Sequence, residues 1–336
     1  MFEKLIKQAK EQMKTMVFTE GTDKRILEAT SRLLAEDLMK VILVGNEAEV
    51  KKLAADNGFN IDGATIIDPA AYEHMDEMVD SMVELRKGKM SPEECREALQ
   101  KGNYFGTMLV KMGKADCLLG GATYSTADTI RPALQLVKTK PGTHLVSSCF
   151  ILNRDFGPEE LRTICMGDCA VNLDYTDNLD KEGNVVFSGA QKLAEVIVEC
   201  ANCAGKFGID PKVAVLSFST NGSGKGGTVE FSREATRIAR EQHPEMKIDG
   251  EMQFDAAVSP GVGQLKFPGS PVAGYANTFI FPLIEAGNIG YKIAQRLGGY
   301  AAYGPILLGL NAPINDLSRG CDAEEVYSMA IITAAL

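Results

Sequence analysis

Short apolar runs alternate with longer amphipathic segments along most of the chain, which is the pattern of an α/β protein. The run at 15–21 predicts a buried strand, and the helix expected after it carries Ile26, Ala29 and Leu33 at helical spacing. Similar runs predict further strands in the first half at 40–45, 64–68, 115–120 and 144–150. Strands that are buried on both faces have continuous apolar runs, so we expect a largely parallel sheet covered by helices.

The second half repeats this alternation. Strands are predicted at 162–168, 212–219 and 277–282, and helices near 189–207, 228–242 and 286–298. A length of 336 residues fits two domains of ordinary size, and we place their boundary near residue 145. The polar stretch at 172–188 is expected to be a surface loop. The fold class is therefore α/β, with two three-layer αβα domains.

Composition narrows the functional classes. Hydrophobic residues make up 45% and charged residues 24%, as in globular proteins, and a net charge of −10 argues against nucleic acid as a partner. No run approaches the ~20 apolar residues of a membrane span, so no membrane partner and a cytoplasmic location are expected. Cys200 and Cys203 form the single C-x-x-C, which lies in a helical pattern without a second ligand pair, and we interpret it as structural. His74, His144 and His243 suggest neither a triad nor a metal site.

The densest chemistry lies near the end of the chain, in the stretch Asn315–Glu325, which contains a hydroxyl, a guanidinium, a thiol and several carboxylates. A strand-like run at 304–310 ends just before it, and a final helix is predicted to begin near Asp322. Ser318 and Arg319 therefore fall on the loop between them. Ligands of α/β sheets collect beyond the carboxyl ends of strands, which makes this loop a candidate site.

The same residues also have a purely structural interpretation. Asp322 and Glu325 have the spacing of an N-cap and its third helical residue, which together form a capping box without any catalytic role. Ser318 fits a turn, Arg319 a surface cation and Cys321 a small buried apolar residue. Spacing alone leaves both interpretations open.

A glycine-rich loop at 217–227 lies between a predicted strand and a predicted helix, where backbone amides can bind phosphate. It contains Ser223, Gly224 and Lys225. Ser219 stands where a P-loop needs glycine and Gly226 where it needs a hydroxyl, so this is not a P-loop. It also lacks the dinucleotide pattern, which weakens a dehydrogenase interpretation. Tight turns without a ligand are the alternative.

Several separate motifs, taken together and in order, resemble the phosphate acetyltransferase family. They lie at 124–132, 168–172, 217–227, 268–277, 286–291 and 313–321, the last reading Pro-Ile-Asn-Asp-Leu-Ser-Arg-Gly-Cys. The resemblance implies a fold shared with isocitrate and isopropylmalate dehydrogenases, with a cleft between the domains. It also implies that the last strand and helix return to the first domain, which gives domains at 1–145 with 303–336 and at 146–302.

The resemblance further implies a reaction in which the thiol of coenzyme A attacks an acyl phosphate, so that phosphate leaves and a thioester forms. Coenzyme A and acetyl-CoA are then substrates, and no metal and no permanently bound cofactor are expected. By the same resemblance, Glu325 is the base for the thiol, while Ser318 and Arg319 stabilise the reacting groups and help to bind coenzyme A. Relatives usually carry aspartate at the position of Glu325.

Binding residues follow from the same resemblance. Arg131 and Arg86 match arginines associated with coenzyme A, although Arg86 also fits a cation at a helix C-terminus. The candidates for binding phosphate or acyl phosphate are Ser223, Gly224, Lys225, Ser125, Thr126 and Asn277.

Partners and alternatives follow as well. The family implies a homodimer that is functionally coupled to acetate kinase. Propionyl or butyryl transfer stays open, because one methylene is worth only about 1–3 kcal/mol in a pocket. A non-catalytic module that senses acyl-CoA, as occurs in fusions to malic enzymes, is the alternative from a different class.

Overall fold

The computed structural model describes residues 2–336, and these form two compact units. We call Phe2–Pro141 together with Leu310–Leu336 the terminal unit, and Gly142–Gly309 the middle unit. The chain therefore leaves the terminal unit once and returns to it for its last segment.

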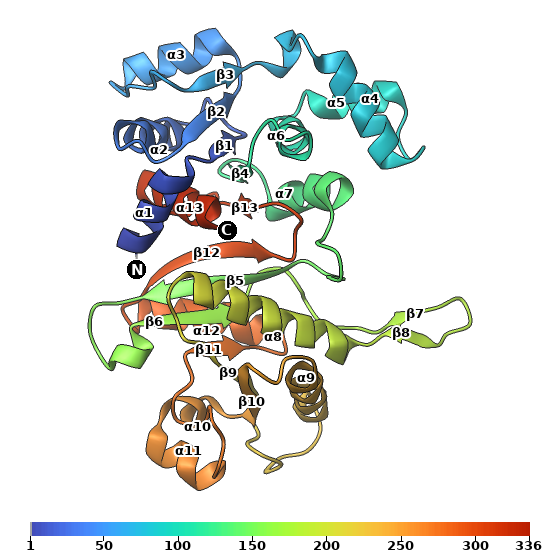
Figure 1. Ribbon diagram of the computed structural model, residues 1–336, viewed down its shortest axis with the longest axis vertical. Helices are drawn as coiled ribbons and strands as arrows, with labels where there is room; N and C mark the ends of the chain where they lie inside the picture. The colour runs from blue at the N-terminus through green and yellow to red at the C-terminus, as the bar shows by residue number, and fades with distance from the viewer. Residues whose placement is uncertain (1) are drawn as a thin grey trace. The chain divides into compact units, whose positions relative to one another are not determined.

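The terminal unit has one five-stranded sheet in the order β13-β4-β1-β2-β3, and every neighbouring pair in it is parallel. Figure 1 shows α13, in red, beside α1, in blue, so that both ends of the described chain lie in this unit. Its elements are α1 (Phe2–Gln12), β1 (Thr15–Phe18), α2 (Lys24–Ala35), β2 (Lys40–Val44), α3 (Glu47–Asp56), β3 (Thr65–Ile67), η1 (Pro69–Ala71), α4 (Met75–Arg86), α5 (Pro92–Leu99), α6 (Gly102–Lys111), β4 (Cys117–Gly120), α7 (Thr126–Pro132), η2 (Ala133–Val137), β13 (Ile314–Asp316) and α13 (Ala323–Ala335).

The apolar runs that form β1, β2 and β4 are mostly buried, as the sequence predicts, whereas the edge strand β3 is only partly buried. Met16, Val17 and Phe18 of β1 are fully buried, because α6 packs on one face of the sheet while α2 and α13 pack together on the other. Helix starts also follow local chemistry: Ser91 caps α5 with a complete capping box and a proline at its first position.

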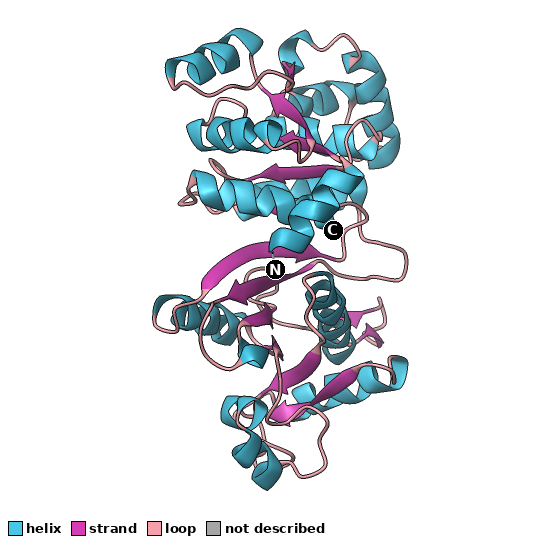
Figure 2. Cartoon of the chain, turned by 60° about the vertical axis from the view of Figure 1, so that its left-hand side comes forward, coloured by secondary structure: helices cyan, strands magenta, loops and turns pink. Residues whose placement is uncertain are grey.

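The middle unit has a mixed six-stranded sheet in the order β10-β9-β11-β6-β5-β12, and helices lie on both of its faces (Figure 2). Strand β5 runs antiparallel to both of its neighbours. The elements are β5 (Ser147–Asn153), η3 (Glu159–Leu161), β6 (Thr163–Gly167), β7 (Asn178–Leu179), β8 (Val185–Phe187), α8 (Gly189–Lys206), β9 (Lys212–Leu216), α9 (Val229–Gln242), β10 (Lys247–Met252), α10 (Phe254–Val258), α11 (Pro260–Lys266), β11 (Thr278–Ile280), α12 (Ile284–Arg296) and β12 (Ala301–Leu308).

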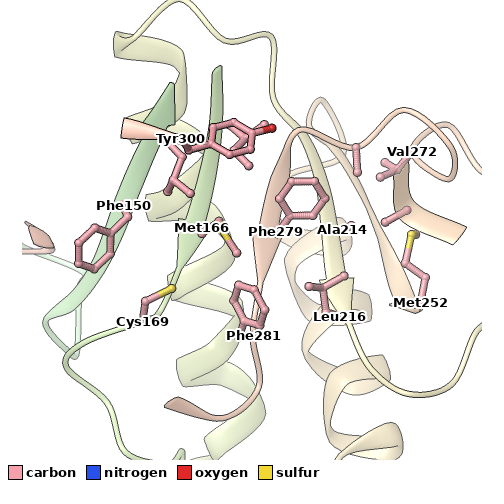
Figure 3. Close-up of a cluster of buried hydrophobic side chains, with 14 of the residues drawn as sticks. Phe150, Met166, Cys169, Ala214, Leu216, Met252, Val272, Phe279, Phe281 and Tyr300 are labelled. Carbon is pink, nitrogen blue, oxygen red and sulfur yellow. The ribbon is translucent and has the colours of Figure 1, made fainter. Parts of the chain in front are cut away.

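One face of this sheet forms a hydrophobic cluster, shown in Figure 3. Phe279 and Phe281 come from β11 and the residue after it, and Met166 comes from the neighbouring β6. Tyr300 closes one side, and its hydroxyl donates to the backbone oxygen of Leu161 at 2.6 Å. A buried tyrosine needs such a partner for its hydroxyl.

Two details differ from the sequence-based expectation. The run expected to return to the first domain, 304–310, lies mainly in β12, which pairs with β5 in the middle unit. The return is made by β13 and α13, because an apolar run does not specify which sheet a strand joins. The stretch at 172–188 is not a plain loop, since β7 and β8 form a small antiparallel hairpin within it.

Among residues 2–336, no helix is both long enough and apolar enough to cross a membrane.

Candidate functional site

The terminal unit contains a polar cavity at the point where the strand order of its sheet reverses. From β1 the chain continues to β2 and β3 on one side, whereas β4 and β13 lie on the other. Ligands of open α/β sheets bind at this point, beyond the carboxyl ends of the strands. The cavity there measures about 570 Å³ and is lined by Thr19, Glu20, Thr22, Asp23, Val44, Lys101, Gly102, Asn103, Thr123, Tyr124 and Asp128.

The loop after β1 is fastened to the loop after β4. Glu20 accepts hydrogen bonds from the backbone amides of Ala122 and Thr123, at 3.0 and 2.5 Å. The hydroxyls of Thr19 and Tyr124 lie 2.8 Å apart, and burial raises the pKa of the Tyr124 phenol. Tyr124 therefore stays protonated and serves as a hydrogen-bonding group in this wall of the cavity.

Arg25 joins three loops and uses all of its N–H groups. Its Nε and Nη2 donate to the carboxylate of Asp23 at 3.0 and 2.8 Å, and Nη2 also donates to the oxygen of Ala122 at 2.9 Å. Its Nη1 donates to the backbone oxygens of Arg319 and Cys321, at 2.9 and 3.0 Å. Arg25 thus anchors the Ser318–Arg319 loop to the loops that line the cavity.

Asp316, the last residue of β13, is a buried carboxylate below this loop. Its Oδ2 accepts from the hydroxyl of Thr126 at 2.5 Å, and its Oδ1 accepts from the hydroxyl of Thr129. Burial, together with the charges of Glu20 and Asp128, raises the pKa of Asp316 to about 6, although the two hydroxyl donors act in the opposite direction.

Ser318 and Arg319 are both exposed at the end of β13. The hydroxyl of Ser318 accepts from the amide of Gly320 at 3.2 Å, and its carbonyl accepts from Cys321 at 2.9 Å, so the turn interpretation of this serine is confirmed. In the described part of the chain, the guanidinium of Arg319 has no hydrogen-bond or ion-pair partner. An exposed turn that carries a free guanidinium and a hydroxyl on consecutive residues is a suitable place for a phosphoryl or carbonyl oxygen.

Glu325 forms the capping box that the structural interpretation predicts. The amide of Asp322 donates to its Oε2 at 3.1 Å, and its own amide donates to Oδ1 of Asp322 at 2.8 Å. The side chain is exposed, and its other oxygen has no partner among the described residues. A base role for Glu325 must therefore operate alongside the cap.

Arg131 and Arg86 lie in the same unit. Arg131 belongs to α7 with its side chain 59% exposed, and its Nη1 lies 3.7 Å from Oδ1 of Asp128. Arg86 is in the last turn of α4, as its structural alternative predicts, and α4 packs against η2, which follows α7 directly. The Nε of Arg86 is buried without a hydrogen-bond partner, so this arginine has capacity left for an anion.

Ser125 and Thr126 are already committed to carboxylates. The hydroxyl of Ser125 donates to Asp128 at 2.7 Å, and the hydroxyl of Thr126 donates to Asp316. As direct phosphate ligands they would have to break these bonds. The structure thus argues against both residues as phosphate ligands. Asp316 was missed in the sequence as a hydrogen-bond partner, because its position depends on the strand order of the sheet.

In the middle unit, the glycine-rich loop at 217–227 binds a carboxylate side chain of the protein itself. Glu251 is buried, and its Oε1 accepts from the amide of Gly222 and the hydroxyl of Ser219, both at 2.8 Å. Burial opposes its charge, but Arg233, at 3.1 Å, and these donors lower the pKa of Glu251 overall. The amide of Gly224 donates to Ser219 at 2.8 Å. A carboxylate therefore takes the place expected for phosphate.

The same loop contains two other residues that were expected to bind phosphate, Ser223 and Lys225. The hydroxyl of Ser223 accepts from the amide of Thr220 at 3.0 Å and so closes the loop. Lys225 is exposed, and its ammonium has no partner within residues 2–336, which leaves it available to a ligand.

Asn277 has to be removed from the phosphate set. It is 7% exposed, its Oδ1 accepts from the amide of Lys212 at 2.8 Å, and its Nδ2 donates to the oxygen of Asp210 at 2.9 Å. These bonds tie together the amino ends of β9 and β11, whereas the glycine loop follows the carboxyl end of β9. The side chain of Asn277 therefore has a structural role at the opposite edge of the sheet.

The cysteines are buried free thiols, Cys200 and Cys203 in α8 among them. The sulfur of Cys203 lies 3.5 Å from that of Cys149 in β5. These thiols pack a helix on the sheet, in agreement with a structural role.

The chain is similar to known proteins over nearly its whole length. A phosphate acetyltransferase of Bacillus subtilis is 50% identical over 320 residues, which cover 95% of this chain and 94% of that protein. The crystal structure of a phosphotransacetylase from Streptococcus pyogenes superposes with a TM-score of 0.91 at 48% identity, covering 100% of this chain and 98% of the other. A candidate 4-hydroxythreonine-4-phosphate dehydrogenase from Salmonella typhimurium shares the fold, with a TM-score of 0.50 at 13% identity over 96% of this chain and 99% of the other.

The model of one protein family, described as "Phosphate acetyl/butaryl transferase", matches residues 1–334, which is nearly the whole chain. Together with the identity of the relatives over nearly their full length, this shows that the chain belongs to the phosphate acetyl/butyryl transferase family.

Proposed function

We propose that this protein is a phosphate acetyltransferase, which moves an acetyl group reversibly between coenzyme A and inorganic phosphate. The observation that supports this most directly is the unpaired guanidinium of Arg319, the residue after Ser318, on an exposed turn that Arg25 holds next to the cavity. The reactants carry phosphate groups, and a guanidinium binds phosphate through two parallel hydrogen bonds.

In the direction of thioester formation, the thiol of coenzyme A loses its proton and attacks the carbonyl carbon of acetyl phosphate. The carbonyl becomes a tetrahedral oxyanion, and phosphate leaves as the thioester forms. Arg319 and the hydroxyl of Ser318 supply charge and a donor for the developing oxyanion or the departing phosphate. These contacts are stronger in the transition state than with the neutral carbonyl, and that difference accelerates the reaction.

Glu325 is our candidate for the base. A carboxylate is a much weaker base than a thiolate, so the free-energy difference for full proton transfer from coenzyme A is unfavourable. The positive charge of Arg319 stabilises the thiolate and reduces this difference. The free carboxylate oxygen of Glu325 can accept the proton while the other oxygen keeps its bond to Asp322.

Arg131 and Arg86 are our candidates for the phosphates of coenzyme A, because both have donors without a strong carboxylate partner. Lys225 is our remaining candidate on the side of acyl phosphate, with Ser223 and Gly224 as parts of the loop that presents it. No permanently bound cofactor is required for this chemistry, since coenzyme A enters as a substrate.

The activity is tested with the purified full chain by following thioester formation from coenzyme A and acyl phosphates. Initial rates with acetyl, propionyl and butyryl phosphate determine the acyl preference, and acetyl phosphate is expected to give the highest kcat/KM. Binding of coenzyme A without turnover of any of the three would instead support the non-catalytic acyl-CoA sensor.

A homodimer is part of the proposal. Helix α12 and the residue that caps its end expose Ile289, Ile293 and Leu297, which are 58%, 53% and 84% accessible and recur at helical spacing. An apolar stripe of this kind is typical of a protein–protein contact. Sedimentation of the full chain is expected to give twice the monomer mass, and Ile293→Glu is expected to shift it toward monomer. We further propose a cytoplasmic enzyme whose acetyl phosphate is used by acetate kinase.

A further inference from the structure

Asp316 connects two parts of the proposed site that are far apart in sequence. It ends β13, pairs with Gly120 of β4 in the sheet, and is 1% exposed. Its carboxylate accepts from the hydroxyls of Thr126 and Thr129 on α7. Ser318 follows only two residues later, so one side chain joins α7 directly to the start of the Ser318–Arg319 turn.

The two threonines and Arg131 occupy different sides of α7. Thr126 and Thr129 are three residues apart and therefore share one face of the helix. Arg131 lies about 200° further round from Thr129, at 100° per residue, and its side chain is 59% exposed. Holding the threonine face against Asp316 thus fixes the direction in which Arg131 points.

The chain leaves little space around this carboxylate. A β-carbon on Gly121 would collide with Oδ1 of Asp316, and the φ of +99° at this residue also favours glycine. The amide of Leu317 donates to the oxygen of Gly120 at 2.7 Å, which ties the start of the turn to β4. Asp316 is therefore enclosed by β13, the loop after β4 and α7.

Within residues 2–336, no lysine or arginine pairs with Asp316. The charged groups that act on it, Glu20 and Asp128, are acidic. Burying a carboxylate without a cation is costly, and two neutral hydroxyls offset only part of that cost. If this position served only for packing, an uncharged side chain would be buried there at a lower free-energy cost.

We propose that Asp316 is a positioning residue of the acyl transfer, which acts through Thr126 and Thr129 to hold Arg131 in a fixed relation to the Ser318–Arg319 turn. This inference rests on the proposed function, because it takes Arg131 as a coenzyme A ligand. Asp316 itself contacts neither substrate. It thereby fixes the position of the phosphates bound by Arg131 relative to the reacting thiol.

The first test removes the two hydroxyls and keeps the shape of the side chains, in a Thr126→Val/Thr129→Val double variant. A misplacement of about 1 Å can cost about 10²-fold in rate, so kcat/KM for coenzyme A is expected to fall by up to that order, but by no more than in Arg131→Ala. KM for acetyl phosphate is expected to change less than about threefold. The conservative variant Thr126→Ser/Thr129→Ser keeps both donors and is expected to restore most of the activity.

The control is Thr236→Val in the middle unit. Thr236 is also a buried helical threonine, with its hydroxyl donating to the oxygen of Ser232 at 2.7 Å. Thr236→Val is expected to lose some thermal stability without a change in kcat/KM above about twofold. An equal loss of kcat/KM in this control would show a general stability effect and would overturn the inference.

The decisive test combines Asp316→Asn with Arg131→Ala, measured by kinetics and by calorimetric binding of coenzyme A. If Asp316 acts through Arg131, Asp316→Asn weakens coenzyme A binding in the wild-type background but by less than about twofold in the Arg131→Ala background. Equal effects in both backgrounds overturn the inference and leave the proposed function intact. Wild-type binding of coenzyme A by Arg131→Ala alone would instead refute the role of Arg131 in the proposed function.

Discussion

One substitution, Glu325→Gln, distinguishes the proposed role of Glu325 as a base from its role in the capping box. The side-chain amide keeps its length and a carbonyl oxygen that can accept from the amide of Asp322, which now lies 3.1 Å from Oε2. The amide of Glu325 itself still donates to Asp322, at 2.8 Å. The capping box therefore survives, and only the charge is lost.

The cost in stability follows from the exposure of this helix end. A carboxylate in the first turn of an exposed helix contributes about 0.3–1 kcal/mol through the helix dipole. Glu325→Gln is therefore expected to lower the free energy of unfolding by less than about 1 kcal/mol, which corresponds to a few degrees in Tm. Complete loss of the cap in Asp322→Ala is expected to cost about 1 kcal/mol.

The cost in catalysis is far larger if Glu325 is the base. General-base assistance is worth about 10²–10⁴-fold, so kcat is expected to fall by that order while KM changes little. The loss is expected to shrink above pH ~8.5, because free thiolate then accumulates without a base. Initial rates with acetyl phosphate and coenzyme A from pH 6.5 to 9.5 measure both effects.

Glu324→Gln is the matched control. Glu324 precedes Glu325 in the same exposed helical turn and pairs with Arg32 at 2.7 Å, so the substitution removes the same charge without touching the cap. It is expected to leave kcat within about twofold. A Glu325→Gln enzyme with the kcat of this control would refute the base assignment and leave Glu325 with its capping role alone.

Three further predictions concern other residues of the terminal unit. Arg131→Ala is expected to raise KM for coenzyme A about 10-fold or more with little change for acetyl phosphate, and the defect is expected to shrink with dephospho-coenzyme A if the 3′-phosphate is its partner. Arg25→Lys keeps the charge but supplies three N–H donors in place of five, so kcat is expected to fall about 10–100-fold as the Ser318–Arg319 turn loosens, and an unchanged kcat would contradict that anchor. The pKa of Asp316 is raised by burial to about 6, above its unfolded value of 3.8, so its contribution to stability is full below pH 3.8 and is lost as pH rises through 6. Urea unfolding at pH 4.5 and 7.5 is therefore expected to show that the wild type loses about 2 kcal/mol relative to Asp316→Asn over this range, and parallel curves would contradict the raised pKa.

Local patterns in the sequence determined most of the secondary structure. The apolar runs at 40–45 and 115–120 became β2 and β4, and the capping box at Asp322 begins a helix as predicted. Strand burial, helical periodicity and helix caps depend on residues a few positions apart, so a single sequence is enough to locate them. The series of motifs was likewise enough to indicate the family that the comparisons show.

The partners of individual polar groups were decided only by the tertiary structure. Thr126 and Asp316 are 190 residues apart and meet because β13 pairs with β4, and Glu251 fills the glycine loop because β10 lies beside β9. Asn277 was misplaced for the same reason, since its motif does not show at which edge of the sheet it lies. Strand order and sheet edge arise from packing between distant segments, and a pattern read along the chain carries no information about them.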